Sequence, residues 1–69
     1  MEDAKLTEME RLVLKELVNG GSNKIIAQKL FLSEKTVKNH LSSIYKKLNV
    51  KNRTNAAVKC IESPLLMLG

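Results

Sequence analysis

Residues 22–48 decide the fold of this 69-residue chain, and they read SNKIIAQKLFLSEKTVKNHLSSIYKKL. Ser22 and Ser33 are each suited to begin a helix, because a serine hydroxyl can accept a hydrogen bond from a backbone N–H of the first turn. The two serines therefore predict helices over about residues 23–30 and 34–48, separated by Phe31-Leu32-Ser33. Two short helices joined by so brief a turn form the outline of a helix-turn-helix.

The second of these helices has two faces of opposite character. Its apolar residues recur at helical spacing, at Val37, Leu41, Ile44 and Leu48. They form one narrow stripe, which is typical of a helix face that packs against a core. The opposite face holds Lys35, Asn39, Ser42, Ser43 and Lys46, with Lys38 on its flank. A basic helix of this kind fits the major groove of DNA, but an amphipathic helix with a solvated outer face has the same pattern.

The candidate DNA contacts divide by chemistry. Lysine can donate to guanine O6 and N7, and asparagine can pair with adenine N6 and N7. The predicted base-reading residues are Lys35, Lys38, Asn39 and Ser42. The predicted phosphate-binding residues are Asn23, Lys24, Ser33, Thr36, His40, Lys46 and Lys47. For Thr36, a local hydrogen bond to the backbone is an equal alternative.

Two further helices flank this pair. Thr7 and Glu10 have the spacing of a capping box, and Asn19-Gly20-Gly21 ends the run, so the first helix should cover about residues 8–19. Its apolar residues are Met9, Leu12, Val13, Leu17 and Val18. The fourth helix should run over about residues 53–62, from an Asn52 cap to a stop at Pro64. Its inward face is expected to hold Ala56, Ala57, Cys60 and Ile61, with Val58 pointing away.

Composition and length bound the possible functions. No alternating strand pattern occurs, so the chain is expected to be one all-α domain over residues 1–69, with a core at 6–62, a short N-terminal lead and an apolar C-terminal tail. A chain this short leaves little room for an enclosed substrate pocket. It has no nucleophile–base pair, phosphate-binding glycine loop or set of metal ligands, so we expect neither an enzyme nor a metal or cofactor. With no signal peptide or apolar span, it is expected in the cytoplasm.

Charge is distributed unevenly along the chain. Residues 1–21 carry five acidic and three basic side chains, whereas residues 22–69 carry nine basic side chains and only Glu34 and Glu62 as acids. A basic region of this kind favours a polyanionic partner, although a solvated lysine-rich surface gives the same count.

Several single residues have plainer interpretations than DNA contact. Phe31 and Tyr45 are the only aromatic residues and are expected in the core, which disfavours proteins that stack single-stranded bases on exposed rings. Cys60 is expected to pack as a small buried residue. His40 has no second histidine to form a metal site with, so phosphate contact or partial packing is expected there. Arg53 could bond the preceding turn or a phosphate, and the sequence favours neither.

Four segments carry a resemblance to a known family. Residues 6–11 (LTEMER), 23–30 (NKIIAQKL), 31–40 (FLSEKTVKNH) and 47–56 (KLNVKNRTNA) follow the order and spacing of one motif series. That series is L-T-x-R/E-E, N-K-E-I-A-x-x-L, L-x-I-S-E-x-T-V-K-x-H and K-L-x-V-x-x-R-x-x-A. The chain therefore resembles the LuxR-type (GerE/NarL/FixJ-like) helix-turn-helix domain of bacterial transcriptional regulators. Ile25, where glutamate is common in the family, is a small departure.

The resemblance implies a four-helix domain that binds operator DNA as a dimer and regulates transcription. The third helix would read the major groove of an inverted-repeat operator, and the fourth would pair with a second copy. The dimer contact would involve Asn55, Val58, Lys59 and Glu62. RNA polymerase is a further expected partner, in a nucleoid-associated protein that touches no membrane. Family members often carry this domain behind a receiver or sensor domain, and we expect no such domain within these 69 residues.

Two other classes of protein remain open at this stage. A promoter-recognition module of a sigma factor shares the opening motif, but it predicts an arginine-rich recognition helix and a longer link than Gly20-Gly21. A protein-interaction domain could use the apolar tail Leu65-Leu66-Met67-Leu68, but it would leave the basic face of the 34–48 helix without a role.

Overall fold

The computed structural model describes residues 5–62, and these residues form four α-helices and no strand. The helices are α1 (Glu8–Val18), α2 (Asn23–Leu30), α3 (Glu34–Leu48) and α4 (Arg53–Glu62). The all-α, four-helix prediction is confirmed, with one boundary shifted because α1 ends at Val18 and Asn19 caps it. The stop expected at Pro64 and the apolar tail lie outside the described residues. Within residues 5–62, no helix has the length and apolar character needed to cross a membrane.

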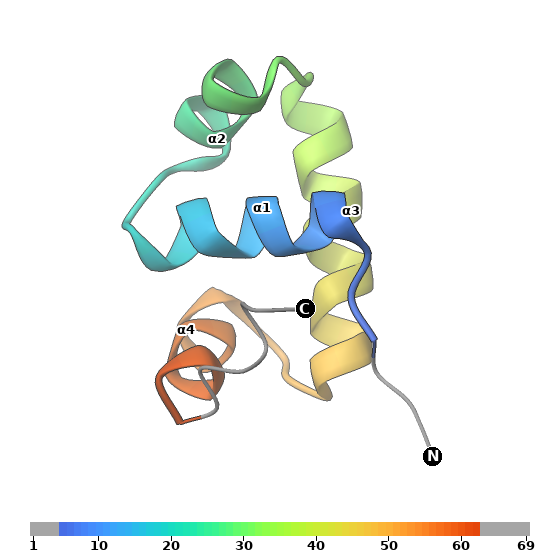
Figure 1. The fold of residues 1–69 in the computed structure, drawn as a ribbon, viewed down its shortest axis with the longest axis vertical. Helices are drawn as coiled ribbons and strands as arrows, with labels where there is room; N and C mark the ends of the chain where they lie inside the picture. The colour runs from blue at the N-terminus through green and yellow to red at the C-terminus, as the bar shows by residue number, and fades with distance from the viewer. Residues whose placement is uncertain (1–4, 63–69) are drawn as a thin grey trace.

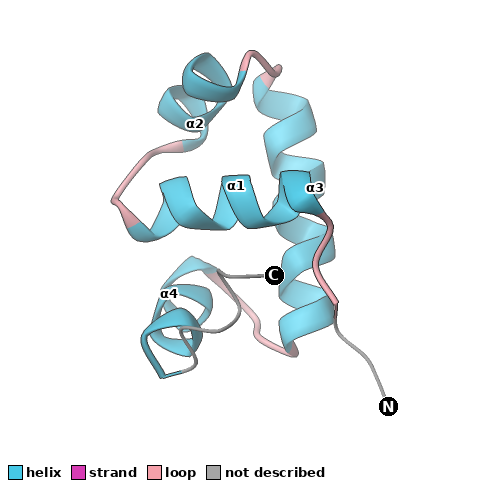
Figure 2. Cartoon of the chain, viewed as in Figure 1, coloured by secondary structure: helices cyan, strands magenta, loops and turns pink. Residues whose placement is uncertain are grey.

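Helix α1 lies at the centre of the arrangement (Figure 1). It crosses α3, with α2 on one side and α4 on the other, and it contacts all three of these helices. Helices α2 and α3 also pack against each other across a very short connection (Figure 2). They form the helix-turn-helix that residues 22–48 predicted.

Every helix begins at a side-chain cap that the sequence predicted. Backbone N–H groups of the first turns donate to Thr7 (3.1 Å), Ser22 (3.2 Å), Ser33 (3.0 Å) and Asn52 (2.9 Å). The predicted capping box is also present, because the Thr7 N–H donates to Oε1 of Glu10 at 2.8 Å. These bonds satisfy N–H groups that have no partner inside the helix.

Helices α1, α2 and α3 end in a common way. In each, one residue with a left-handed backbone follows the helix, at Gly20 (φ 90°), Phe31 (φ 58°) and Asn49 (φ 58°). The next N–H then returns to a carbonyl of the last turn at 2.9 Å. Glycine takes this conformation freely and asparagine tolerates it, whereas an ordinary side chain is strained there by about 1–2 kcal/mol. Phe31 is therefore the strained member of the three.

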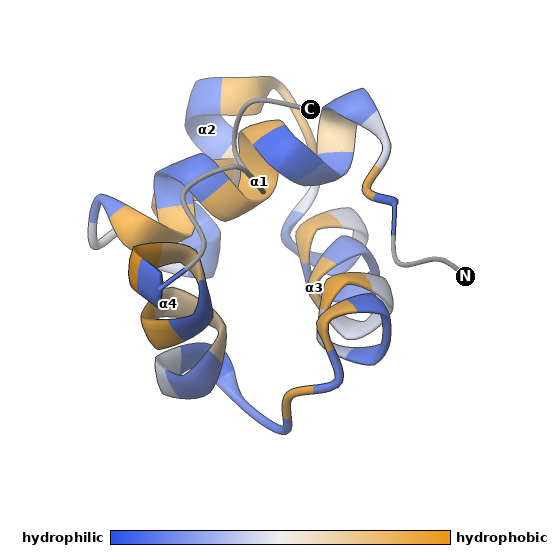
Figure 3. Ribbon diagram, turned by 60° about the horizontal axis from the view of Figure 1, so that its bottom comes forward, coloured by the Kyte–Doolittle hydropathy of each residue, from blue (hydrophilic) through white to orange (hydrophobic). Residues whose placement is uncertain are grey.

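The core joins all four helices. Its buried apolar residues are Leu6, Val13, Leu14, Leu17, Ile26, Ala27, Val37, Leu41, Ile44, Leu48, Ala56 and Cys60. The predicted stripe of α3 is thus buried in full, and Figure 3 shows the hydrophobic residues of α3 turned toward α1 and α4. Tyr45 packs partly against this core, and Cys60 is buried as predicted.

The buried stripe of α1 differs from the predicted one. Leu14 is fully buried, whereas Leu12, which the apolar spacing assigned to the stripe, is 40% exposed. The stripe actually runs through positions 10, 13, 14 and 17, and its first member is the buried acid Glu10. The sequence-based prediction considered only apolar residues, so it left out Glu10 and placed the buried face on the side of α1 that holds Leu12.

Two residues expected in the core are exposed. Phe31 is 94% exposed, because its left-handed backbone turns its ring outward while Leu30 and Leu32 on either side pack against the core. Ile61 is 73% exposed. The buried residues of α4 are Ala56 and Cys60, so its inward face is narrower than predicted and Ile61 falls outside it.

Candidate nucleic-acid interface

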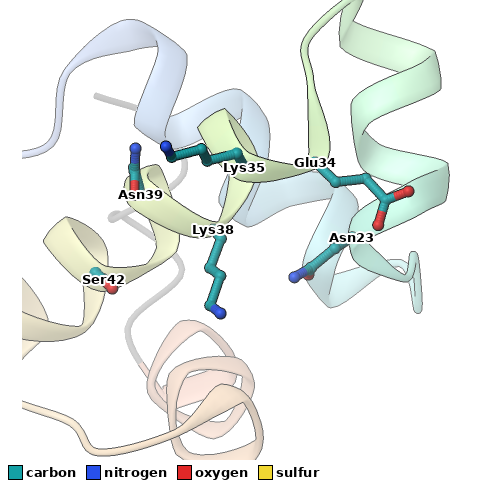
Figure 4. Close-up of a pocket in the computed structure, with 6 residues that line it drawn as sticks. All are labelled: Asn23, Glu34, Lys35, Lys38, Asn39 and Ser42. Atoms are coloured by element: carbon teal, nitrogen blue, oxygen red, sulfur yellow. The ribbon is translucent and has the colours of Figure 1, made fainter.

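The first half of α3 and the start of α2 form an open pocket (Figure 4). It is lined by Asn23, Glu34, Lys35, Lys38, Asn39 and Ser42. All four residues that the sequence predicted to read bases therefore lie together, and Asn23 from α2 joins them. The side chains of Lys35, Lys38 and Asn39 are exposed and form no hydrogen bond or ion pair within residues 5–62. Their donors remain available to a ligand.

Glu34 lines this pocket and was missed by the sequence reasoning. It belongs to the first turn of α3, where a negative charge is favoured by the helix dipole, and this structural explanation accounts for an acid at that position without a pocket. Figure 4 shows the Glu34 and Lys35 side chains extending in opposite directions from the start of α3. A carboxylate at this position can accept a hydrogen bond from cytosine N4. Its place directly before Lys35 is the signal that could have found it.

Ser33 and Thr36 are hydrogen-bonded to each other at the N-terminus of α3. Oγ of Ser33 accepts from the Thr36 N–H at 3.0 Å and donates to Oγ1 of Thr36 at 2.9 Å. The Thr36 hydroxyl is thus engaged locally, but with the Ser33 side chain rather than with the backbone as the sequence-based alternative had it. Because Oγ1 acts as an acceptor there, the hydroxyl hydrogen of Thr36 is left to donate elsewhere.

Asn23 and Lys24 begin α2 beside the pocket. Lys24 is exposed and Asn23 is half-buried. Arg53, at the start of α4, donates to Oδ1 of Asn23 at 2.9 Å and to the carbonyl oxygen of Gly21 at 2.7 Å. Arg53 therefore bonds the segment between α1 and α2, and not the turn between α3 and α4 that directly precedes it in the sequence.

The second half of α3 is tied to α1 through Glu10. Lys47 donates to Oε1 of Glu10 at 2.7 Å, and Ser43 donates to Oε2 at 2.7 Å. The Glu10 side chain is only 5% exposed. Ser43 thus leaves the outer face to which its spacing assigned it, and the ion pair argues against the phosphate contact expected for Lys47. The neighbouring Lys46 is exposed and has no such partner within residues 5–62.

The Glu10 network lowers the pKa of its carboxyl group. Burial alone raises that pKa, but hydrogen bonds from Lys47, the Thr7 backbone and Ser43, together with the positive charge of Lys47, outweigh burial. The pKa falls from 4.5 to about 2. Glu10 is therefore ionised at neutral pH and serves as a structural acceptor between α1 and α3.

The remaining predicted residues lie at the edge of α3 and along α4. His40 is half-buried, and residues 5–62 contain no group of three side chains that could hold a metal ion. The predicted dimer residues are all exposed: Asn55, Val58, Lys59 and Glu62. Val58 and Ile61 are three positions apart on α4 and are 45% and 73% exposed, so they form an apolar pair on its surface.

Comparison with known proteins identifies the family. The sequence pattern described as "GerE: Bacterial regulatory proteins, luxR family" matches residues 4–60. The chain belongs to the LuxR family of bacterial regulatory proteins. This membership confirms the resemblance seen in the four motif segments, and LuxR-family helix-turn-helix domains bind DNA.

Two relatives illustrate how much of a LuxR-family regulator the chain covers. The uncharacterized transcriptional regulatory protein YhcZ of Bacillus subtilis is 52% identical over 58 residues, which are 84% of this chain but 27% of YhcZ. The spore germination protein GerE of Bacillus subtilis is 48% identical over 56 residues, which are 81% of this chain and 76% of GerE. The chain thus spans about a quarter of YhcZ and about three quarters of GerE.

A solved structure matches this LuxR-family fold. The crystal structure of the response regulator ChrA, from a heme-sensing two-component system, superposes with a TM-score of 0.82 at 47% sequence identity. The match covers 87% of this chain and 30% of the ChrA chain. The four-helix arrangement is therefore that of the DNA-binding part of a response regulator.

Proposed function

We propose that this domain binds double-stranded DNA sequence-specifically, with the first half of α3 in the major groove, and thereby regulates transcription. The observation that carries the proposal is the open pocket, where Lys35, Lys38, Asn39 and Ser42 stand together on the outer face of α3. Exposed donors on the N-terminal half of a helix match the way recognition helices reach base edges. Glu34 joins this set as an acceptor for cytosine N4.

Phosphate contacts flank the base-reading set. The residues proposed for them are Asn23, Lys24, Ser33, Thr36, His40 and Lys46. They lie at the start of α2, at the start of α3 and along the edge of α3, where they would meet the DNA backbone on either side of the groove. Lys47 is omitted because Glu10 holds its ammonium group.

A second copy of the chain is proposed to pair through α4. Asn55, Val58, Lys59 and Glu62 supply the contact, and the exposed Ile61 extends its apolar part beside Val58. So short a helix buries little area, so the pair should form mainly on DNA. A two-fold pair would place two recognition helices about one DNA turn apart, on an inverted repeat with half-sites roughly 10 bp between centres. Val58→Glu should abolish cooperative binding to the full repeat and spare weak binding to one half-site.

The biological setting is proposed from the family. Regulators of this kind act on operators, where RNA polymerase also binds, so RNA polymerase is proposed as a further partner. Because its DNA target lies in the nucleoid, the protein would work in the cytoplasm. The relatives in which this region is a quarter of the chain are transcriptional regulatory proteins. No enzymatic activity is proposed for residues 5–62.

Binding-site selection from random duplexes, followed by sequencing, tests the proposal. Selection should enrich an inverted repeat, and Asn39→Ala should weaken binding to it by about 1–3 kcal/mol while affecting random DNA less. Gln28→Ala is the matched control, because Gln28 is an exposed amide outside the pocket. Failure to enrich any sequence, or affinity that does not change with salt, would contradict the DNA-binding function.

A further inference from the structure

Arg53 connects the start of α4 to the start of α2. Its Nη1 donates to Oδ1 of Asn23 at 2.9 Å, and its Nη2 donates to the carbonyl oxygen of Gly21 at 2.7 Å. Arg53 and Asn23 are 30 positions apart in the sequence, and both side chains are half-buried. The guanidinium group is thus held by two acceptors of the protein itself.

The bond to Arg53 determines which way the Asn23 amide faces. An asparagine amide can be turned by half a rotation, which exchanges its oxygen and its nitrogen. A guanidinium group carries only donors, so it can pair only with the amide oxygen. The Nδ2 group must then face away from Arg53, and Figure 4 shows the Asn23 nitrogen directed toward the side of the pocket where Lys38 lies. Nδ2 donates to no acceptor within residues 5–62.

We propose that Arg53 is a positioning residue for DNA binding, which orients Asn23 so that both N–H donors of its amide meet a DNA phosphate. The inference rests on the proposed function and deepens it. A phosphate at the start of a helix is held by N–H donors. Ser22 accepts from the N–H groups of Ile25 and Ile26. The Asn23 amide therefore adds two donors to the backbone N–H groups of Asn23 and Lys24. Arg53 belongs to α4, so the helix proposed for pairing also positions a DNA contact.

Two other roles for Arg53 make different predictions. If Arg53 contacted a phosphate itself, its positive charge would contribute to the salt dependence of binding. If its bonds only fastened α4 to the turn before α2, its replacement would lower stability and leave the role of Asn23 in DNA binding unchanged. The proposed role requires instead that the effect of Arg53 on DNA binding pass through Asn23.

A double-mutant cycle on a short random-sequence duplex at low salt tests this dependence. Asn23→Ala should weaken binding about tenfold, as expected for a lost hydrogen bond to a charged group. Arg53→Lys keeps the positive charge but loses the two guanidinium nitrogens that together bond Asn23 and Gly21, and should weaken DNA binding several-fold. In the Asn23→Ala background, Arg53→Lys should add no further loss. An equal loss in both backgrounds would overturn the proposal. Thermal melting of each variant confirms that it is folded at the temperature of the binding measurement.

Two further variants separate orientation from charge and from folding. Asn23→Asp keeps an acceptor for Arg53, so the fold should be retained, but it has no N–H donor and should bind DNA at least as weakly as Asn23→Ala. Wild-type affinity in Asn23→Asp would overturn the proposal. Arg53→Gln should leave the salt slope unchanged, whereas a slope lower by about 0.9 would indicate direct phosphate contact and also overturn it. If the wild-type protein fails to bind any duplex, the proposed function fails first.

Discussion

The two halves of α3 have similar side chains and opposite surroundings. In the first half, Lys35 and Lys38 are exposed and have no protein partner within residues 5–62. In the second half, Lys47 is paired with the buried Glu10, which also accepts from Ser43. Whether a lysine on the polar side of this helix is free for a ligand or tied to the protein thus depends on whether α1 presents an acceptor to it, as Glu10 does to Lys47. The hydrogen bonds that join the Glu10 side chain of α1 to α3 involve Ser43 and Lys47, both in the second half.

Removing Glu10, which holds the second half of α3 against α1, should have the largest effect on the free energy of unfolding. Glu10→Ala leaves the Lys47 ammonium, the Ser43 hydroxyl and the Thr7 N–H without their common acceptor. Breaking a buried ion pair by removing one partner lowers the free energy of unfolding by about 3–5 kcal/mol. Thermal or urea unfolding measures this loss, and Glu8→Ala is the control because Glu8 is exposed in the same turn of α1. Equal effects of the two substitutions would show that the network contributes little.

Acid should lower the free energy of unfolding through the same Glu10 network. Because the folded pKa of Glu10 is lowered from 4.5 to about 2, its contribution to stability is complete above pH 4.5 and is lost as the pH falls toward 2. Over that window the free energy of unfolding should fall by up to about 1.4 kcal/mol per pH unit from this group. Urea unfolding across the window measures the slope. Glu10→Gln should remove this component, and an unchanged slope in that variant would assign the acid sensitivity to other carboxyl groups.

The adjacent lysines Lys46 and Lys47 give a matched test of the boundary between structural and DNA-binding roles. Lys47→Ala should lower the free energy of unfolding by about 2 kcal/mol, because it leaves Glu10 buried with fewer donors. Lys46→Ala should leave stability within about 0.5 kcal/mol of wild type and reduce the salt slope of DNA binding by about 0.9. Unfolding and salt titrations on the two variants should show opposite patterns. If Lys47→Ala also reduced the salt slope, Lys47 would contact DNA despite its ion pair.

The smallest expected effect lies at the turn that precedes α3. Phe31→Gly should stabilise the protein by about 0.5–1 kcal/mol, because glycine relieves the left-handed strain but gains freedom in the unfolded chain. The ring is 94% exposed, so little packing is lost. Phe31→Ala is the control, since it removes the ring and keeps the strain, and should change stability little. Destabilisation by both substitutions would mean that the ring contributes contacts despite its exposure.

Local signals predicted the helices well. Thr7, Ser22, Ser33 and Asn52 cap their helices through bonds that span three residues, and such bonds depend only on neighbours in the sequence. The base-reading candidates were also found, because helical periodicity places them opposite a buried stripe. Their contacts with DNA stay a prediction.

The features that sequence reasoning missed depend on distant contacts or on backbone geometry. Glu10 meets Ser43 and Lys47 across 33 and 37 positions of sequence, and no local pattern announces that pairing. Arg53 meets Asn23 in the same way. Phe31 was assigned to the core from its apolar character, whereas its backbone conformation at the end of α2 turns it outward.

Under the proposed function, the lack of protein partners in the first half of α3 affects how preferences for new DNA sequences could arise. Lys35, Lys38, Asn39 and Ser42 form no bond that the fold within residues 5–62 depends on. A small domain has little stability to spare, and a substitution at a buried or bonded position commonly removes about 0.5–3 kcal/mol of it. Substitutions at these four positions can therefore be sampled in combination without unfolding the domain. The set of DNA sequences that the domain is proposed to recognise can then change while its fold stays the same.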